Sequence, residues 1–230
     1  MDASRPSSAA SRVKPAKAGE PPRRQRNSGK TRAEILAAAR VEFCERGFEG
    51  ARVDAIADRA AANKRLLYHY FGNKEELYCA VLLDAYQEIR RGERALSLDH
   101  FGPVEAMDRL VRFTFRHFLA NPWFTRLLAN ENLENARFLK TLPDIPALHS
   151  PLVGQIAGIL ERGGAEGLFR RDVDPIQLYI SIAALGYFYV SNIKTLSVIF
   201  QRDLSNISMV QEREAQAVHM VLDFLRTRRP

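Results

Sequence analysis

The sequence predicts an all-α fold, and three observations support that prediction. From Thr31 onward, apolar residues recur at the three- and four-residue spacing of amphipathic helices. No segment shows the period-two alternation of a half-buried strand, and no Asn-Gly or Asp-Gly pair offers a tight hairpin. Helix start and stop signals divide the chain into about nine helices. The 230 residues are enough for one or two domains with a sizeable core.

The N-terminal part is expected to hold three short helices and the start of a long fourth one. Thr31 with Glu34, and Asn73 with Glu76, have the spacing of capping boxes, in which side chains satisfy the free backbone N–H groups of a first helical turn. Asn63 is a further cap candidate. The helices expected here cover about 31–46, 53–60, 64–70 and 74 to beyond 89.

Five more helices are expected towards the C-terminus. Four of them start at a proline, because Pro fits the first position of a helix, where its missing N–H has no partner. Gly102-Pro103, Asn121-Pro122, Ser150-Pro151 and Asp174-Pro175 would each start one. The expected ranges are 103–120, 122 onward, 151–162, 175–200 and about 209–226.

The positive charge is concentrated at the N-terminus. The net charge is +7, and residues 1–32 hold nine basic against two acidic side chains, whereas the rest of the chain holds 25 of each. Residues 1–30 are rich in Ala, Ser, Pro and Arg and are expected to form a disordered basic arm. Such an arm indicates either a solubilising tail or one that follows the phosphates or minor groove of DNA.

Composition disfavours several other classes. Two cysteines exclude a disulfide scaffold, and no apolar leader precedes the arm, so we expect a cytoplasmic protein. No dinucleotide, P-loop or zinc-protease motif occurs, and the five histidines lie far apart, so neither an enzyme, a metal site nor a cofactor is expected. Residues 175–200 are apolar enough for a membrane span, but five polar residues interrupt them, which favours burial against other helices instead: Gln177, Ser181, Ser191, Asn192 and Lys194.

Residues 53–72 have the pattern of a helix-turn-helix. Two short helices are joined by Ala61-Ala62-Asn63, and the second begins with Lys64 and Arg65. In this motif the second helix enters the major groove and its first residues reach the base edges, where Arg can bond guanine with two hydrogen bonds. The segment is therefore expected to bind DNA.

Residues 29–78 resemble the DNA-binding domain of the TetR family of bacterial regulators. The resemblance rests on Gly47-Phe48, Ile56-Ala57, the run from Leu67 to Phe71, and the exit from Asn73 to Leu77. It implies a DNA-binding domain over 31–77 and an effector-binding and dimerisation domain over 78–230, with some likeness to the RutR branch. It also implies that 64–69 form the recognition helix and that Lys74 holds a phosphate.

The resemblance supplies the expected contacts. Arg52 stands where the family has a Ser or Thr cap, Ala61-Ala62 where it often has Gly-Val, and Arg65-Leu66 where it has Gly-Thr, so the operator cannot be taken from a relative. Ala61 would then need a backbone conformation that favours glycine. The expected DNA contacts are Arg32, Arg52, Asn63, Lys64, Arg65, Leu66, Tyr68, His69 and Lys74.

The C-terminal two-thirds are expected to hold a ligand pocket and a dimer interface. The expected effector contacts are Phe113, Arg116, His117, Trp123, Phe124, Leu127, Asn130, Tyr187, Phe188 and Asn192. The expected dimerisation residues are Ile182, Gly186, Tyr189, Val218, Leu222 and Leu225. Together with the resemblance, these expectations imply a nucleoid-associated homodimeric repressor that leaves a palindromic operator when a small molecule binds. A sequence-tolerant architectural DNA-binding protein and a TetR-like activator remain the alternatives.

Overall fold

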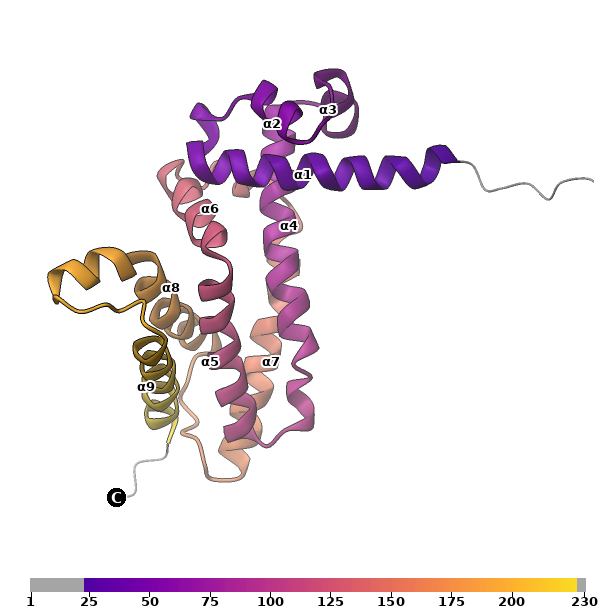
Figure 1. Ribbon diagram of the computed structural model, residues 1–230. Coiled ribbons are helices and arrows are strands. Elements are labelled where there is room, and N and C mark those ends of the chain that lie inside the picture. Colours follow the sequence, from indigo (N-terminus) through magenta and orange to yellow (C-terminus); the bar gives the residue numbers. More distant parts are fainter. Residues whose placement is uncertain (1–22, 227–230) are drawn as a thin grey trace, which may run out of the picture.

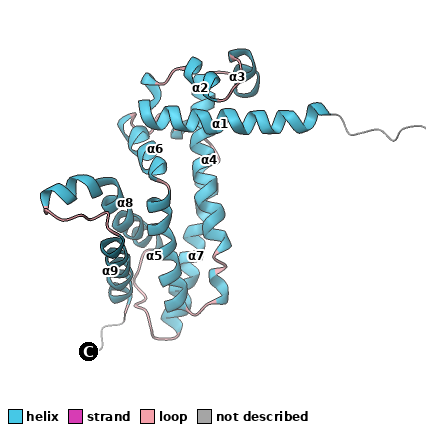
Figure 2. Cartoon of the chain, viewed as in Figure 1, coloured by secondary structure: helices cyan, strands magenta, loops and turns pink. Residues whose placement is uncertain are grey.

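The computed structural model describes residues 23–226, with side chains from Ser28 onward, and in this part of the chain helices are joined by loops and turns (Figures 1 and 2). Its α-helices are α1 Arg23–Gly50, α2 Val53–Arg59, α3 Lys64–Phe71, α4 Lys74–Ala95, α5 Pro103–Ala120, α6 Pro122–Leu133, α7 Ile145–Ala165, α8 Pro175–Ile199 and α9 Ile207–Leu225. Two 3₁₀ turns cover Leu98–His100 and Leu139–Thr141. The all-α prediction is confirmed.

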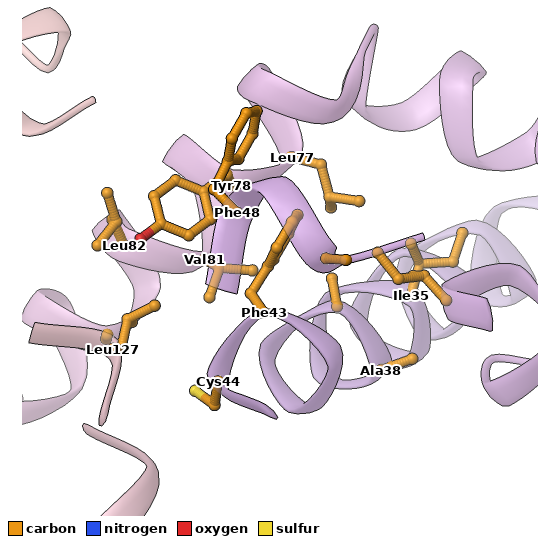
Figure 3. Close-up of a cluster of buried hydrophobic side chains, with 14 of the residues drawn as sticks. Ile35, Ala38, Phe43, Cys44, Phe48, Leu77, Tyr78, Val81, Leu82 and Leu127 are labelled. Atoms are coloured by element: carbon orange, nitrogen blue, oxygen red, sulfur yellow. The ribbon is translucent and has the colours of Figure 1, made fainter. Parts of the chain in front are cut away.

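Helices α1 to α3 form a head at one end of the molecule, and α4 runs from that head along the rest of the chain (Figure 1). The core of the head gathers Phe43, Phe48 and Tyr78, whose rings meet edge to face with centroids 4.9 Å (Phe43–Tyr78) and 5.4 Å (Phe48–Tyr78) apart. Leu127 of α6 belongs to the same buried cluster (Figure 3). The head and the C-terminal domain therefore share one apolar core at their junction.

The C-terminal domain is built around α5, which packs against α7, α8 and α9. Its apolar core includes Met107, Leu110 and Val111 of α5 with Ile156 of α7 and Val218 of α9. Most apolar side chains of α5 lie on the inner face of the helix and are buried, as the sequence pattern indicates. Arginines occupy its outer side.

Several expected helix boundaries are confirmed by their caps. The Asn63 side chain accepts the Leu66 N–H at 2.8 Å. Asn73 and Glu76 form the reciprocal capping box, because Asn73 Oδ1 accepts the Glu76 N–H at 2.9 Å and Asn73 Nδ2 donates to Glu76 Oε1 at 2.8 Å. The Asp174 side chain accepts two N–H groups at the start of α8.

Two expected boundaries are wrong. Helix α1 begins at Arg23, so Thr31 lies inside it and the expected N-terminal capping box is not formed there. The part of the expected disordered arm from Arg23 to Lys30 is accordingly helical, while residues 1–22 lie outside the described residues. Helix α7 begins at Ile145, with Pro146 in its first turn and Pro151 inside it, because the earlier proline offers the same helix start.

Helix α8 is long and apolar enough to cross a membrane by length and composition alone. One side of it lies on α5: a Cβ at Gly186 would come within 3.2 Å of the Cα of Phe115. Ile176, Ile180 and Phe188 on another side are exposed. Its composition is that of a helix with one apolar face in the core and a second apolar face left on the protomer surface.

Candidate nucleic-acid interface and effector site

The helix-turn-helix is formed by α2, the turn at 60–63 and α3. Ala61 has φ 48°, in the left-handed region that favours glycine, as the departure from the usual glycine at this turn predicts. Its N–H still donates to the carbonyl of Asp58 at 3.1 Å, and the N–H of Ala62 donates to Ala57 at 2.9 Å. The turn therefore keeps its hydrogen bonds at the expense of one strained alanine.

Helix α3 has one buried face and one open face. Leu67 and Phe71 are buried, whereas Arg65, Tyr68 and His69 are exposed along the opposite side at the spacing of one helical turn. Tyr68 keeps 44% of its surface exposed, so it does not pack against α4. Leu66 is half-buried. The open face offers one guanidinium, one phenol and one imidazole to a partner.

Lys64 is held by an acidic neighbour that the sequence analysis missed. Its Nζ lies 2.6 Å from Asp54 Oδ1 of α2, and this hydrogen bond raises the pKa of Lys64. Arg65 makes no ion pair with residues 28–226. Arg65 is therefore the first-turn cation of α3 that is unengaged, while the charge of Lys64 is largely balanced by Asp54.

Two other expected DNA contacts lie at the margin of the head. Arg52 precedes α2 without capping it, as expected, and its N–H donates to Glu42 Oε1 at 3.2 Å while the side chain is exposed. The Arg32 guanidinium lies 4.8 Å from the ring centroid of Phe71. This contact fixes Arg32 beside α3.

Lys74 lies at the start of α4, where the first-turn N–H groups point outward. Its Nζ donates to the carbonyl of Glu49 at 3.3 Å and lies 4.7 Å from the ring centroid of Phe48. The ammonium is thereby positioned on the head, and no carboxylate of residues 28–226 pairs with it. Its position suits a phosphate oxygen.

Several polar contacts tie the C-terminal domain to the head. Asn130 of α6 donates from Nδ2 to the carbonyl of Phe43 at 3.0 Å. Arg137 pairs with Glu49 at 3.1 Å and lies 5.1 Å from the ring centroid of Phe48. Asn130, an expected effector contact, is thus engaged in holding α6 to α1.

The other α6 residues expected in the effector site make contacts within the protomer. Phe124 and Leu127 are fully buried in the shared core. Trp123 is half-buried: its ring centroid lies 4.3 Å from the Arg40 guanidinium, and its Nε1 donates to Asn121 Oδ1 at 3.1 Å. The Phe124 ring also meets the rings of Tyr86 on α4 and His117 on α5.

The α5 residues lie beside a surface hollow of about 560 Å³, lined by Phe113, Arg116, His117 and Asn121 among others. Arg116 makes two hydrogen bonds to Glu214 of α9, at 2.7 and 3.1 Å, so it is committed to a contact within the protomer. The ring of Phe113 lies against Gly92 of α4 so closely that a Cβ on Gly92 would overlap it.

His117 is buried between the helices of the C-terminal domain. Burial lowers its pKa, with a smaller effect in the same direction from the charge of Arg90. Its Nδ1 lies 3.4 Å from Asn121 Nδ2, and its Nε2 has no hydrogen-bond partner among the described residues. A neutral imidazole with an unused nitrogen is therefore present next to the hollow.

Sequence reasoning missed a buried polar cluster on α4. The side chains of Arg90 and Glu93 are 3% and 2% exposed, and Arg90 Nη1 lies 2.9 Å from Glu93 Oε2. Arg90 Nη2 donates to the hydroxyl of Tyr179 at 3.2 Å. Burial raises the pKa of Glu93 to about 7. The available signal was a charged pair on the face of α4 that also carries Tyr86 and Ile89.

The structure places the six expected dimerisation residues in the interior of the protomer. Ile182, Gly186 and Tyr189 of α8 and the three residues of α9 are buried inside the protomer. Because both helices are apolar on more than one side, periodicity gave no means of deciding which side faces the protomer's own core. The residues concerned are Ile182, Gly186, Tyr189, Val218, Leu222 and Leu225.

The outward side of the same two helices is the exposed apolar face. Ile180, Phe188, Met220 and Phe224 are 51%, 58%, 54% and 51% exposed. Three of them, with part of α8, line a hollow of about 460 Å³ between α8 and α9. We call Ile180, Phe188, Met220 and Phe224 the α8–α9 face.

Of the three α8 residues expected to bind effector, one lies on the α8–α9 face and two are half-buried. Phe188 belongs to the α8–α9 face, and Asn192 is half-buried with Nδ2 donating to the Phe188 carbonyl at 2.9 Å. Tyr187 is half-buried, with its ring centroid 5.8 Å from that of Phe118. None of the three reaches the Arg90 cluster through a hydrogen bond found in residues 28–226.

Comparison with known proteins agrees with this geometry. Residues 35–81 match the family model described as bacterial regulatory proteins, tetR family, and residues 103–221 match the one described as tetracyclin repressor-like, C-terminal domain. The chain belongs to the TetR family of bacterial transcriptional regulators. The first of these matches covers the whole helix-turn-helix described above.

Individual TetR-family relatives match over most of their length. The chain is 38% identical to the HTH-type transcriptional repressor NicS of Pseudomonas putida over 80% of this chain and 86% of that one. It is 31% identical to the regulator RutR of Escherichia coli over 67% and 71%. The putative regulator SCO4942 of Streptomyces coelicolor, a solved structure, superimposes with a TM-score of 0.61 at 27% identity over 87% and 99%.

A fourth comparison shows the fold alone. AibR, solved with isovaleryl coenzyme A and operator DNA, has a TM-score of 0.60 at 22% identity over 83% of this chain and 97% of that one. The two family matches and the relatives NicS and RutR show that the protein is a DNA-binding regulator of the TetR family.

Proposed function

We propose that the protein is a homodimeric repressor that binds a palindromic operator and leaves it when a small molecule occupies the C-terminal domain. The observation that carries this proposal is the open face of α3, where Arg65, Tyr68 and His69 are exposed while the other side is locked into the head. A helix held in this way can enter a major groove as a rigid element. The relative NicS is named as a transcriptional repressor, which supports repression rather than activation.

The dimer part of the proposal rests on the α8–α9 face. Four large apolar side chains, each about half exposed, lie together on two adjacent helices. Exposed apolar surface of this kind marks an interaction site, and a two-fold axis through it would give two α3 helices for two half-sites. The DNA sequence that such a two-fold dimer binds is a palindrome.

The release part rests on the junction between the domains. Asn130 and Arg137 bind the head from the effector domain, and α4 is shared by both. A ligand that shifts α4 or α6 therefore alters the position of α3. The switch requires a ligand to bind the two arrangements with different affinity.

The first experiment is a footprint of the full-length protein on the DNA that flanks its own gene. A protected palindrome supports the dimeric regulator. Diffuse protection that salt abolishes supports the architectural alternative, in which phosphate contacts alone hold the protein. A reporter fused to the protected promoter then separates repression from activation, because deletion of the gene raises expression in the first case and lowers it in the second.

We also propose that the protein acts in the cytoplasm, at the nucleoid. The basis is its regulator relatives and the DNA-binding face of α3. A fluorescent fusion that follows the DNA stain supports this location, and one that follows the cell envelope contradicts it.

A further inference from the structure

The buried pair Arg90 and Glu93 lies in the middle of the C-terminal domain, and its polar atoms are poorly satisfied. Within the described residues, Arg90 Nε and Nη1 and both Glu93 carboxylate oxygens make no hydrogen bond, although the two groups pair at 2.9 Å. Buried charged atoms without hydrogen bonds are costly, so such a site gains free energy from a partner that supplies them.

The rings beside the pair form a continuous series that crosses four helices. His149 of α7 meets Tyr86 of α4 at 5.1 Å between centroids, and Tyr86 meets Phe124 of α6 at 5.9 Å. Phe124 meets His117 of α5 at 5.3 Å, and His117 meets Phe113 at 5.9 Å. Burial lowers the pKa of both histidines, and the charge of Arg90 makes a smaller contribution in the same direction.

We propose that Arg90 is the anchor for the carboxylate of a small aromatic carboxylic acid whose ring packs among Tyr86, His117 and Phe124. The planar guanidinium fork matches a carboxylate with two parallel hydrogen bonds. The unused Nε2 of His117 is available to a polar substituent on the ring. This inference names the effector class and therefore rests on the proposed function.

A route to the anchor is present at the α5 hollow. Phe113 and His117 belong both to the ring series and to the lining of the 560 Å³ hollow, so they separate the outside from the cluster. A ligand that enters there has to displace the Phe113 ring from Gly92. Arg109, Arg112 and Arg116 also line the hollow, where they pair with Glu105, Asp108 and Glu214.

The carboxylate of the ligand competes with Glu93 for Arg90. When Glu93 gives up the guanidinium, it takes a proton from solvent, so binding weakens as the pH rises above the range near 7 in which Glu93 titrates. Besides Arg90 and Arg94 on its own helix, the titratable groups that face this cluster are His117 from α5, His149 from α7 and Tyr179 from α8. Both histidines have lowered pKa values, so neither changes charge above pH 7.

The test is calorimetric titration of the full-length protein with benzoate, benzamide and cyclohexanecarboxylate. We expect benzoate to bind, and benzamide, which has the same shape without the charge, to bind at least tenfold more weakly. R90Q should lose benzoate binding, whereas R91Q, which removes an exposed arginine from the next position of α4, should keep it. Equal binding of benzoate and benzamide, or equal effects of the two variants, overturns the anchor.

A second variant keeps the test decisive if R90Q does not fold. E93Q removes the competing charge, so it should bind benzoate with the same affinity at pH 7 and pH 8, whereas the wild type should bind roughly fivefold more weakly at pH 8 than at pH 7. A pH response that is the same in both proteins contradicts the competition with Glu93. Cyclohexanecarboxylate binding as tightly as benzoate contradicts the aromatic part.

The operator separates this inference from the function on which it rests. If the protein protects its palindrome but none of the three probes binds, the aromatic-acid effector is wrong and the repressor stands. If no palindrome is protected, the repressor itself is wrong, whatever benzoate does.

Discussion

Asn130 donates its side-chain amide to the main-chain carbonyl of Phe43 at 3.0 Å, and this bond joins the effector domain to the helix that supports the DNA-reading head. Phe43 is itself fully buried in the core shared by the two domains. The contact therefore joins the two domains through the carbonyl of a buried residue, which has few alternative donors.

Replacing Asn130 with Ala should lower the free energy of unfolding by about 1 kcal/mol, because the Phe43 carbonyl loses its side-chain donor. Urea denaturation measures the change. Asn132→Ala is the matched control, since the Asn132 amide donates to Leu128 within α6 and is exposed; it should change stability by less than about 0.5 kcal/mol. Equal losses in the two variants would show that the bond between the domains is not the cause.

Arg65→Ala and Lys74→Ala should weaken operator binding in different ways. The unengaged Arg65 is expected to read one base, so its loss should cost about 1–3 kcal/mol at one base position and relax preference there. Loss of Lys74 should weaken binding to all sequences alike and reduce the salt slope by about one. Binding titrations against a set of single-base operator variants at several salt concentrations distinguish the two. A new base preference in the Lys74 variant would refute its phosphate role.

Asp54→Asn should strengthen DNA binding at low salt, because it releases Lys64 from the 2.6 Å pair. We expect a steeper salt dependence, by about one ion, in the variant. Asp58→Asn removes another exposed negative charge from the same helix and is the control. In a double-mutant cycle, Lys64→Ala should cost more in the Asp54→Asn background than in the wild type, and an unchanged cost would mean that Asp54 does not restrain Lys64.

The protein should lose stability relative to E93Q as the pH rises from about 4.5 to 7. The pKa of Glu93 is raised to about 7 by burial, so in this range the folded protein holds a proton that the unfolded chain releases. The full difference is at most about 3 kcal/mol. His117 and His149 act in the opposite sense below about pH 6.5, because their lowered pKa values keep them neutral in the folded state. Unfolding curves of both proteins across this range isolate the Glu93 contribution, and parallel pH profiles would exclude it.

Phe224→Glu should convert the homodimer into a monomer, because it places a charge on the α8–α9 face. Leu133→Glu, at an exposed apolar residue of α6, should leave the dimer intact. Light scattering after size exclusion reports the mass directly. A dimeric Phe224→Glu protein with a folded circular dichroism spectrum would rule out this face as the interface.

Local signals predicted the head well, and contacts distant in sequence were the ones that escaped. The caps at Asn63 and Asn73 depend on residues three positions away, so spacing alone revealed them. The pair of Lys64 with Asp54 depends on how α2 crosses α3, which no periodicity states. The strain at Ala61 was predictable because a family glycine is missing there.

The effector domain was predicted less well, for reasons that differ between its helices. Helix α8 is apolar nearly all round, so its sequence could not show that Ile182 faces α5 and Phe188 faces outward. Side chains on α5 and α6 were expected to contact an effector, but Phe124 is buried in the core and Asn130 donates to the Phe43 carbonyl of the head. Arg90 and Glu93 were visible as a charged pair on an apolar stripe, and their spacing was the clue left unused.

The absence of a side chain at Gly92 affects which ligands the C-terminal domain can come to accept. The Phe113 ring lies against it, and any side chain at this position has to move that ring. A Gly92→Ala exchange, a single methyl group, is expected to swing Phe113 towards solvent and widen the path to Arg90. Specificity for larger molecules could then evolve in one step, without altering the operator-reading surface. Selection for induction by bulkier aromatic acids would reveal whether position 92 is where such variants arise.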